Sequence, residues 1–146
     1  MTQPAKPQMH NWNTLPREQV RKGVARVGFR GENVTMVMNF AEPGLEVRPH
    51  SHSFEQIAIC VSGRMNYHVG DQVYEMTAGS MLRVPPNTEH YAEVVGDETV
   101  MNLDVFAPRR GDYEHLVEYQ AAEFAQAPAE STEATASAVV TQFRNA

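Results

Sequence analysis

The chain has 146 residues and a formal net charge of -6, a size that suits one domain and leaves little room for a second. The acidic balance argues against a general nucleic-acid binder, because phosphate binding requires a basic face. No apolar run approaches the roughly 18 residues of a membrane span, and the first residues lack the apolar core of a signal peptide. The single cysteine, Cys60, cannot form an internal disulfide. We therefore expect a cytoplasmic protein in which Cys60 is a small buried side chain.

Residues 1–23 are polar and rich in proline, and we expect an N-terminal arm with little structure of its own. From residue 24 the pattern changes to short strands broken by Gly, Pro, Asn and Asp, with no strong internal helix. The segments with this strand pattern are residues 33–40, 56–63, 64–76, 80–95 and 98–108. Gly70-Asp71 marks a hairpin within the third of them. This spacing predicts an all-β sandwich or barrel over residues 24–110.

Residues 111–146 form a polar, Ala-rich C-terminal tail with few large apolar side chains. Such a segment cannot build a core of its own. We expect a frayed helix or a disordered tail there, and the alternative is a helix that clasps a second subunit.

Two histidines lie two residues apart, at His50 and His52, ahead of a strand-forming segment. Side chains in a strand alternate faces, so residues of equal parity point the same way. Gln56 shares the parity of the two histidines, and Glu55 does not. A regular strand would therefore place Gln56 beside the histidines and Glu55 at the surface, whereas a loop after His52 would break the count.

A second cluster lies in "GSMLRVPPNTEH", residues 79–90, where two prolines stiffen a loop and His90 begins the next strand. Three imidazoles and one amide oxygen on neighbouring antiparallel strands can converge on one divalent transition metal. Neutral imidazole is a good ligand for Fe, Mn, Ni, Zn or Cu, and the carbonyl of Gln56 adds a harder donor. Such a set leaves coordination positions open for substrate or water, as catalysis requires. The alternative is that the histidines are structural.

These two stretches resemble the paired motifs of the cupin superfamily, G-x5-H-x-H-x3-E-x6-G and G-x5-P-x-G-x2-H-x3-N. The matching positions are Gly44, His50, His52, Gln56 and Gly63, then Gly79, Pro85, Asn87, His90 and Val94. The resemblance covers residues 24–110 and implies a double-stranded β-helix, or jelly roll, with a metal in the mouth of the barrel. Gln56 stands where the pattern has Glu, Asn87 where it has Gly, and Val94 where it has Asn. With neutral Gln56, a bound ion would keep its charge of about +2, which strengthens Lewis-acid polarisation.

The last strand carries Asn102, Asp104 and Phe106 on one face. An amide, a carboxylate and an aromatic ring suit a cavity, although the same face could meet solvent at a sheet edge. The segment "LDVFAPRRGDY" is similar to one in the small cupins of pectin and alginate breakdown, which convert 4,5-unsaturated monouronates to keto forms. Single-domain polyketide cyclases share the metal pattern. The resemblance implies metal ligands at His50, His52, Gln56 and His90, and pocket residues at Asp104, Phe106 and Arg110.

We expect a metal-dependent isomerase, tautomerase or cyclase that acts on a small, oxygen-rich carbonyl or enol compound. In this interpretation Asp104 moves the proton and Arg110 binds an acidic group of the substrate. Phe106 and a methionine, Met36 or Met38, would form the apolar wall. One alternative is a non-haem metal dioxygenase that cleaves an enol or diketone, and another is a non-catalytic cupin that binds a small ligand.

Cupins often pair through strand exchange, and the N-terminal arm with Trp12 is a candidate clasp. The resemblance therefore predicts a homodimer. The partner we expect is a small-molecule substrate, with neither nucleic acid nor membrane.

Overall fold

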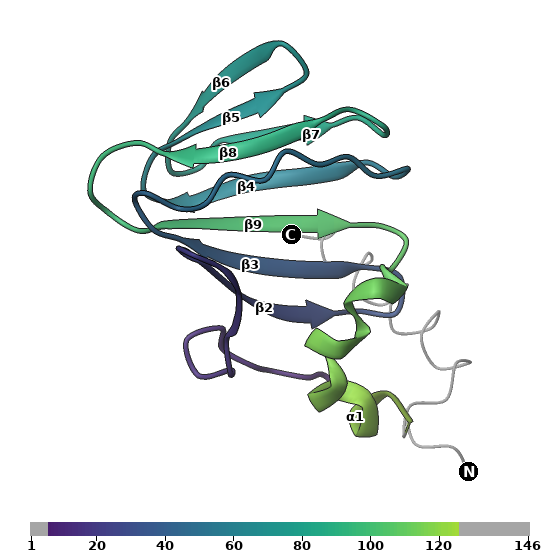
Figure 1. Ribbon diagram of the computed structural model, residues 1–146. Coiled ribbons are helices and arrows are strands. Elements are labelled where there is room, and N and C mark those ends of the chain that lie inside the picture. Colours follow the sequence, from purple (N-terminus) through teal and green to yellow (C-terminus); the bar gives the residue numbers. More distant parts are fainter. Residues whose placement is uncertain (1–5, 126–146) are drawn as a thin grey trace, which may run out of the picture. The chain divides into compact units, whose positions relative to one another are not determined.

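A computed structural model describes residues 6–125 (Figure 1). The larger of two bodies spans residues 11–117 and contains every strand of the described chain. The smaller body joins residues 6–10 to the segment that follows Val117 and contains η2 (Glu118–Gln120) and α1 (Ala121–Ala125). No helix within residues 6–125 is long and apolar enough to cross a membrane.

The larger body consists of two antiparallel sheets. Its strands are β1 (Glu18–Arg21), β2 (Val24–Arg30), β3 (Thr35–Ala41), β4 (Gln56–Ser62), β5 (Met65–Val69), β6 (Gln72–Met76), β7 (Met81–Val84), β8 (His90–Val94) and β9 (Val100–Phe106). Six strands form one sheet in the order β1-β2-β3-β9-β4-β7, and three form the other in the order β6-β5-β8 (Figure 1). The predicted all-β fold is confirmed, and the turn at Gly70-Asp71 joins β5 to β6 as expected.

The main core lies between the two sheets, because both contribute buried side chains to one cluster. Its members are Ala58, Cys60, Met65, Tyr67, Met76, Val84 and Val100. Cys60 is fully buried in this cluster, which confirms its predicted role as a small apolar side chain. The alternation of β4 directs Gln56 inward with Ala58 and Cys60, and the sheet thereby carries an amide into the interior.

A second cluster covers the opposite face of the large sheet. Met38 and Phe40 of β3 pack there with Val27 of β2. Asn39 lies between them in sequence and lines the interior cavity instead. The prediction that Met36 or Met38 forms a wall of the cavity is wrong, because the alternation of β3 places both on the other face from Asn39.

The larger body extends beyond residues 24–110 at both ends. β1 lies within the segment predicted to be an arm and pairs with β2. After β9, the 3-10 helix η1 (Gly111–Leu116) packs on β2, and Val117 is buried. The rest of the predicted tail, residues 126–146, lies outside the described residues.

Candidate metal centre

Backbone hydrogen bonds tie the two histidine segments together. The N–H of His50 donates to the carbonyl oxygen of His90 at 3.2 Å, and the N–H of His90 donates to that of His50 at 2.9 Å. The N–H of Asn87 donates to the carbonyl oxygen of His52 at 2.7 Å. Asn87 has a φ of 59°, in the left-handed region that Asn tolerates better than most residues, so it serves where the motif has Gly. The loop before β4 and the start of β8 are therefore held side by side.

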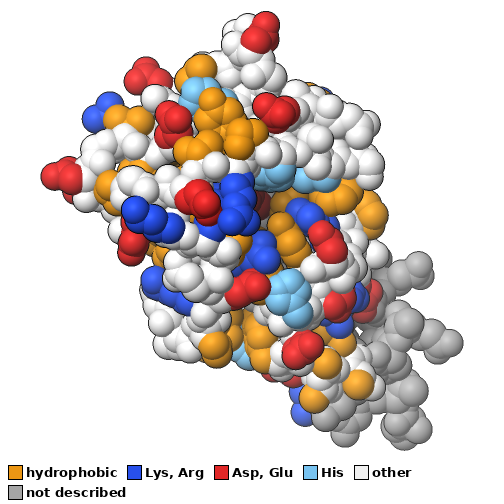
Figure 2. Space-filling view, viewed as in Figure 1, with side chains coloured by type: hydrophobic (Ala, Val, Ile, Leu, Met, Phe, Trp, Pro, Cys, Tyr) orange, Lys and Arg blue, Asp and Glu red, His pale blue; other side chains and the backbone are white. Residues whose placement is uncertain are grey.

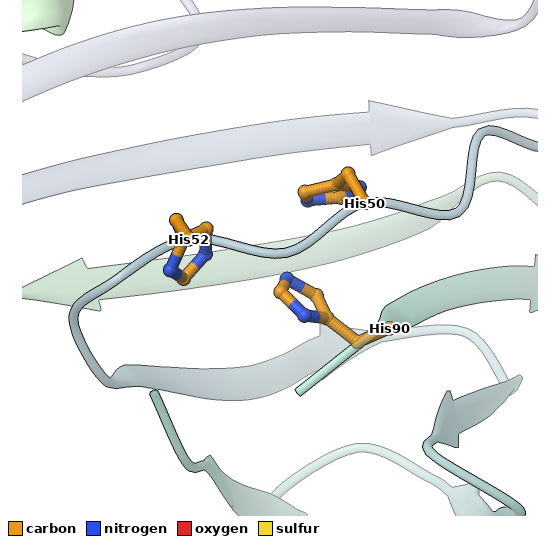
Figure 3. Close-up of side chains that lie close together, drawn as sticks. All are labelled: His50, His52 and His90. Carbon is orange, nitrogen blue, oxygen red and sulfur yellow. The ribbon is translucent and has the colours of Figure 1, made fainter. Parts of the chain in front are cut away.

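Three imidazole rings meet at this junction (Figure 3). The candidate ligand nitrogens of His50, His52 and His90 all lie within 4.8 Å of one another. The ring centroid of His90 is 4.3 Å from that of His50 and 4.9 Å from that of His52. The prediction that His90 lies close to His50 and His52 is therefore confirmed.

Hydrogen bonds fix the same tautomer in all three rings. Each Nδ1 lies beside a backbone carbonyl oxygen: that of Arg48 at 2.9 Å for His50, Phe54 at 2.7 Å for His52, and Thr88 at 2.9 Å for His90. A carbonyl oxygen only accepts, so Nδ1 carries the proton and the lone pair is left on Nε2. This arrangement is the one by which proteins orient histidine ligands of a metal.

Gln56 adds an oxygen whose direction is fixed by its own amide group. Its Nε2 donates to the hydroxyl of Tyr67 at 2.9 Å and to Oδ1 of Asp104 at 2.8 Å. The carbonyl Oε1 therefore points the other way and lies 3.1 Å from Nε2 of His52. With Nδ1 of His52 protonated, Gln56 Oε1 and His52 Nε2 are two acceptors that face each other without a proton between them. A cation that binds both atoms would remove this unfavourable contact.

The residues present fit a divalent transition metal. Nε2 of His90 is buried and has no hydrogen-bond partner in the described part of the chain. Burial lowers the pKa of His90, which favours the neutral form that binds metals. Gln56 Oε1 and His52 Nε2 lie 3.1 Å apart, close enough for both atoms to bind one ion.

A buried carboxylate lies next to the histidines. Asp104 accepts hydrogen bonds from Asn39 Nδ2 at 2.9 Å, Gln56 Nε2 at 2.8 Å and Asn102 Nδ2 at 3.0 Å. Burial raises the pKa of Asp104 to about 7, although the three amides favour the charged form. Burial also raises the pKa of Tyr67, whose hydroxyl stays protonated. The Gln56 amide group is thus hydrogen-bonded to both Tyr67 and Asp104, while its oxygen lies beside Nε2 of His52.

A cavity of about 500 Å³ opens beside these residues, and its lining includes His50, Gln56, Asn102 and Asp104. The face of β9 that carries Asn102 and Asp104 therefore looks into a cavity rather than into solvent at a sheet edge.

Phe106 and Arg110 are not among the residues that line the cavity. The ring of Phe106 is buried and meets the ring of His52 edge-on, with centroids 6.0 Å apart. The guanidinium of Arg110 lies over the rings of Phe106 and Tyr113 and donates through Nε to Asp112 Oδ1 at 3.0 Å. Arg110 thus already binds an acidic group, and that group belongs to the chain itself.

Sequence reasoning missed Asn39 and Tyr67, which orient Asp104 and Gln56. Asn39 carried a usable signal in the sequence, because it is a polar amide flanked by Met38 and Phe40 in a mostly apolar strand. Tyr67 shares a face of β5 with the core residue Met65, so nothing in the sequence indicated its hydrogen bond to Gln56. Glu55 was placed correctly: it is exposed and forms an ion pair with Arg83.

Comparison with known proteins agrees with this geometry. Residues 36–106 match the family described as "Cupin domain". A protein of Bacillus subtilis named H2HPP isomerase is 33% identical over 91 residues, which are 62% of this chain and 39% of that protein. This chain therefore spans less than half of the length of that curated relative.

Solved structures with the same fold include an RmlC-like cupin from Shewanella frigidimarina and KdgF from Halomonas sp. The first has a TM-score of 0.65 and 24% identity over 74% of this chain and 96% of its own. The second has a TM-score of 0.66 and 22% identity over 73% of this chain and 98% of its own. Both likenesses support the predicted double-stranded β-helix, and at these identities they extend to the fold alone.

Proposed function

We propose that the protein, in which residues 36–106 match the family described as "Cupin domain", is a metal-dependent isomerase, tautomerase or cyclase. Its substrate would be a small, oxygen-rich carbonyl or enol compound. The observation that carries the proposal is the convergence of three Nε2 lone pairs and one amide oxygen beside a cavity that also holds a carboxylate. The name of the Bacillus subtilis relative supports the isomerase class.

The proposed metal ligands are His50, His52, Gln56 and His90. A divalent cation held by them would supply Lewis-acid polarisation of a substrate oxygen. The protein's own contribution is orientation, because the carbonyls of Arg48, Phe54 and Thr88 hold the three rings by their Nδ1 atoms.

Asp104 is the proposed proton carrier. Its carboxylate lines the cavity and is held by three amides, so it can take a proton from a carbon next to a carbonyl and return it to another atom of the same molecule. Such a transfer changes neither the composition nor the oxidation state of the substrate. Asn39 and Asn102 keep the carboxylate oriented, since each donates to one of its oxygens.

Phe106 and Arg110 have a proposed structural role, which is to hold the His52 ring in place. Phe106 packs against His52 and Phe54, and Arg110 covers Phe106 from the other side. These contacts limit the movement of the His52 ring and keep water away from its edge.

The test is turnover by the metal-loaded protein in the absence of oxygen. The panel should contain 4,5-unsaturated uronates, 1,3-diketones and the substrate of the H2HPP isomerase. We expect anaerobic conversion of one compound class, and a loss of at least about 100-fold in kcat for Asp104→Asn with unchanged metal content. The matched control is Asp97→Asn, since Asp97 is exposed and lies outside the cavity lining.

Turnover that requires oxygen would replace this proposal with a dioxygenase. Unchanged turnover by the Asp104 variant would remove Asp104 from the reaction. A ligand that stays intact through long incubation with the loaded protein would instead indicate a binding protein.

A further inference from the structure

Three arginines line the cavity that contains His50 and Asp104. Arg21 ends β1, Arg26 belongs to β2, and Arg48 lies in the loop before His50. Among the described residues of the cavity lining, Asp104 is the one carboxylate. Figure 2 shows Lys and Arg side chains gathered near the centre of the visible face, close to histidines. The cavity lining therefore contains three cationic side chains and one carboxyl group.

Two of the three arginines are neutralised by their own partners. Arg26 Nε lies 2.8 Å from Glu18 Oε2, and Arg48 Nη2 lies 3.1 Å from Glu46 Oε2. Neither glutamate lines the cavity.

Arg21 differs from the other two. Its Nε donates to the backbone carbonyl of Glu46 at 2.7 Å, and within residues 6–125 no carboxylate lies within ion-pair distance of its guanidinium. The side chain is half-buried, and this burial together with the nearby charge of Arg48 lowers the pKa of Arg21. The charge is thus partly desolvated and has no carboxylate within ion-pair distance in the described residues, although the charge of Glu46 acts on it, and an arriving anion would compensate it further.

We propose that Arg21 binds a carboxylate of the substrate, so that the cavity selects small monoanionic compounds. This proposal rests on the proposed function of the cavity. With Nε already bonded to Glu46, the two terminal nitrogens of Arg21 remain, and two parallel N–H donors match the two oxygens of one carboxylate. In the metal-free protein a phosphate, which carries up to two charges, would find no second free arginine, because Arg26 and Arg48 are paired.

This assignment gives Arg21 the role that the sequence alone led us to expect of Arg110. Arg110 points its donors at Asp112 and lies among aromatic rings outside the cavity lining. Arg21 was not a candidate, because it falls in the segment predicted to be an unstructured arm.

Binding of stable probes tests the proposal without any turnover. Glucuronate, glucose and glucose 6-phosphate share one ring and differ in the acidic group. Titration calorimetry should be performed on the metal-free and on the metal-loaded full-length protein. We expect glucuronate to bind more tightly than both other probes, and Arg21→Gln to weaken glucuronate binding roughly 10- to 100-fold in both forms. Arg21→Lys keeps the charge, and its affinity for glucuronate should lie between those of the wild type and Arg21→Gln.

The matched control is Arg64→Gln, since Arg64 is exposed and lies outside the cavity lining. It should bind glucuronate within twofold of the wild type, and unfolding midpoints should show that all variants are folded. Equal affinity of wild type and Arg21→Gln for glucuronate, or no preference for glucuronate over glucose or glucose 6-phosphate, would overturn the proposal. Failure of the proposed function is a separate result, because it appears as absent turnover by the wild type.

Discussion

Proton positions in the site are set by backbone carbonyls before any ion arrives. Each of His50, His52 and His90 has Nδ1 beside such an oxygen, and Gln56 is turned by Tyr67 and Asp104. The four candidate ligand atoms therefore already direct lone pairs into the site, and their side chains need not rotate to bind an ion. A site arranged in this way loses little side-chain entropy on binding, which favours affinity.

Asp104 should make the stability of the metal-free protein depend on pH. Its pKa is about 7 in the folded state against 3.8 as the ordinary value. Between these values the folded state holds a proton that the unfolded chain has released, so the free energy of unfolding falls as pH rises. The change attributable to this residue is at most about 4 kcal/mol. Urea unfolding of chelator-treated protein between pH 4 and 8 measures it.

The variant Asp104→Asn should lack this part of the pH dependence. It should therefore gain stability relative to the wild type as pH rises from 4 to 7. Asp97→Asn is the control and should keep the wild-type slope, since Asp97 is exposed. Parallel curves for wild type and Asp104→Asn would show that Asp104 is not the group responsible.

At this scale the sequence predicted that His90 converges with His50 and His52, but not which residues surround them. Parity favoured Gln56 over Glu55, but its premise of a regular strand from His50 was wrong, because β4 begins at Gln56 and residues 51–55 form a loop. The partners that orient Asp104 came from β3 and β9, and their contact depends on the register Asn39↔Asn102. Such a register between strands far apart in sequence is not encoded in any local pattern.

At the scale of elements, the site depends on β4, β8 and β9 rather than on one continuous motif. β4 carries Gln56, β8 begins with His90, and β9 carries Asp104. β9 lies between β3 and β4 in the large sheet, so its register determines where the carboxylate meets the amide. Ala58 of β4 pairs directly with Asp104, which places Gln56 one inward position away.

The packing of η1 on β2 can be tested at Gly28. A Cβ there would lie 2.7 Å from Leu116 Cβ and 3.2 Å from Val117 Cγ1. Gly28→Ala should therefore lower the free energy of unfolding by about 1–3 kcal/mol, measured by urea unfolding, while the metal content stays unchanged. The control is Gly111→Ala, because a Cβ at Gly111 meets nothing within 4 Å. If the two variants are equally stable, η1 does not pack on β2 as described.

The boundaries of the larger body were the part that sequence patterns did not predict. β1 has four residues, EQVR, which are too few and too polar to show a strand period. It exists because it pairs with β2, and the same pairing brings Arg21 to the cavity. η1 likewise reads as a polar segment, and only its contact with β2 reveals that it belongs to the folded body.

On the scale of the larger body, the two sheets enclose a core, and Met65 and Tyr67 of this core also line the cavity beside the histidines. The strands and their hairpin could be predicted because each has turn residues at its ends. The homodimer and the cytoplasmic location remain predictions from the sequence.

The central claim is that His50, His52, Gln56 and His90 hold one divalent cation, and metal analysis of protein purified without chelators tests it most directly. We expect about one transition metal per chain in the wild type. The control His115→Ala should contain the same amount, since His115 is exposed. His52→Ala and His90→Ala should contain almost none and should gain none on reconstitution. A wild type that takes up no metal when it is supplied, or a His90 variant that retains a full complement, would contradict it.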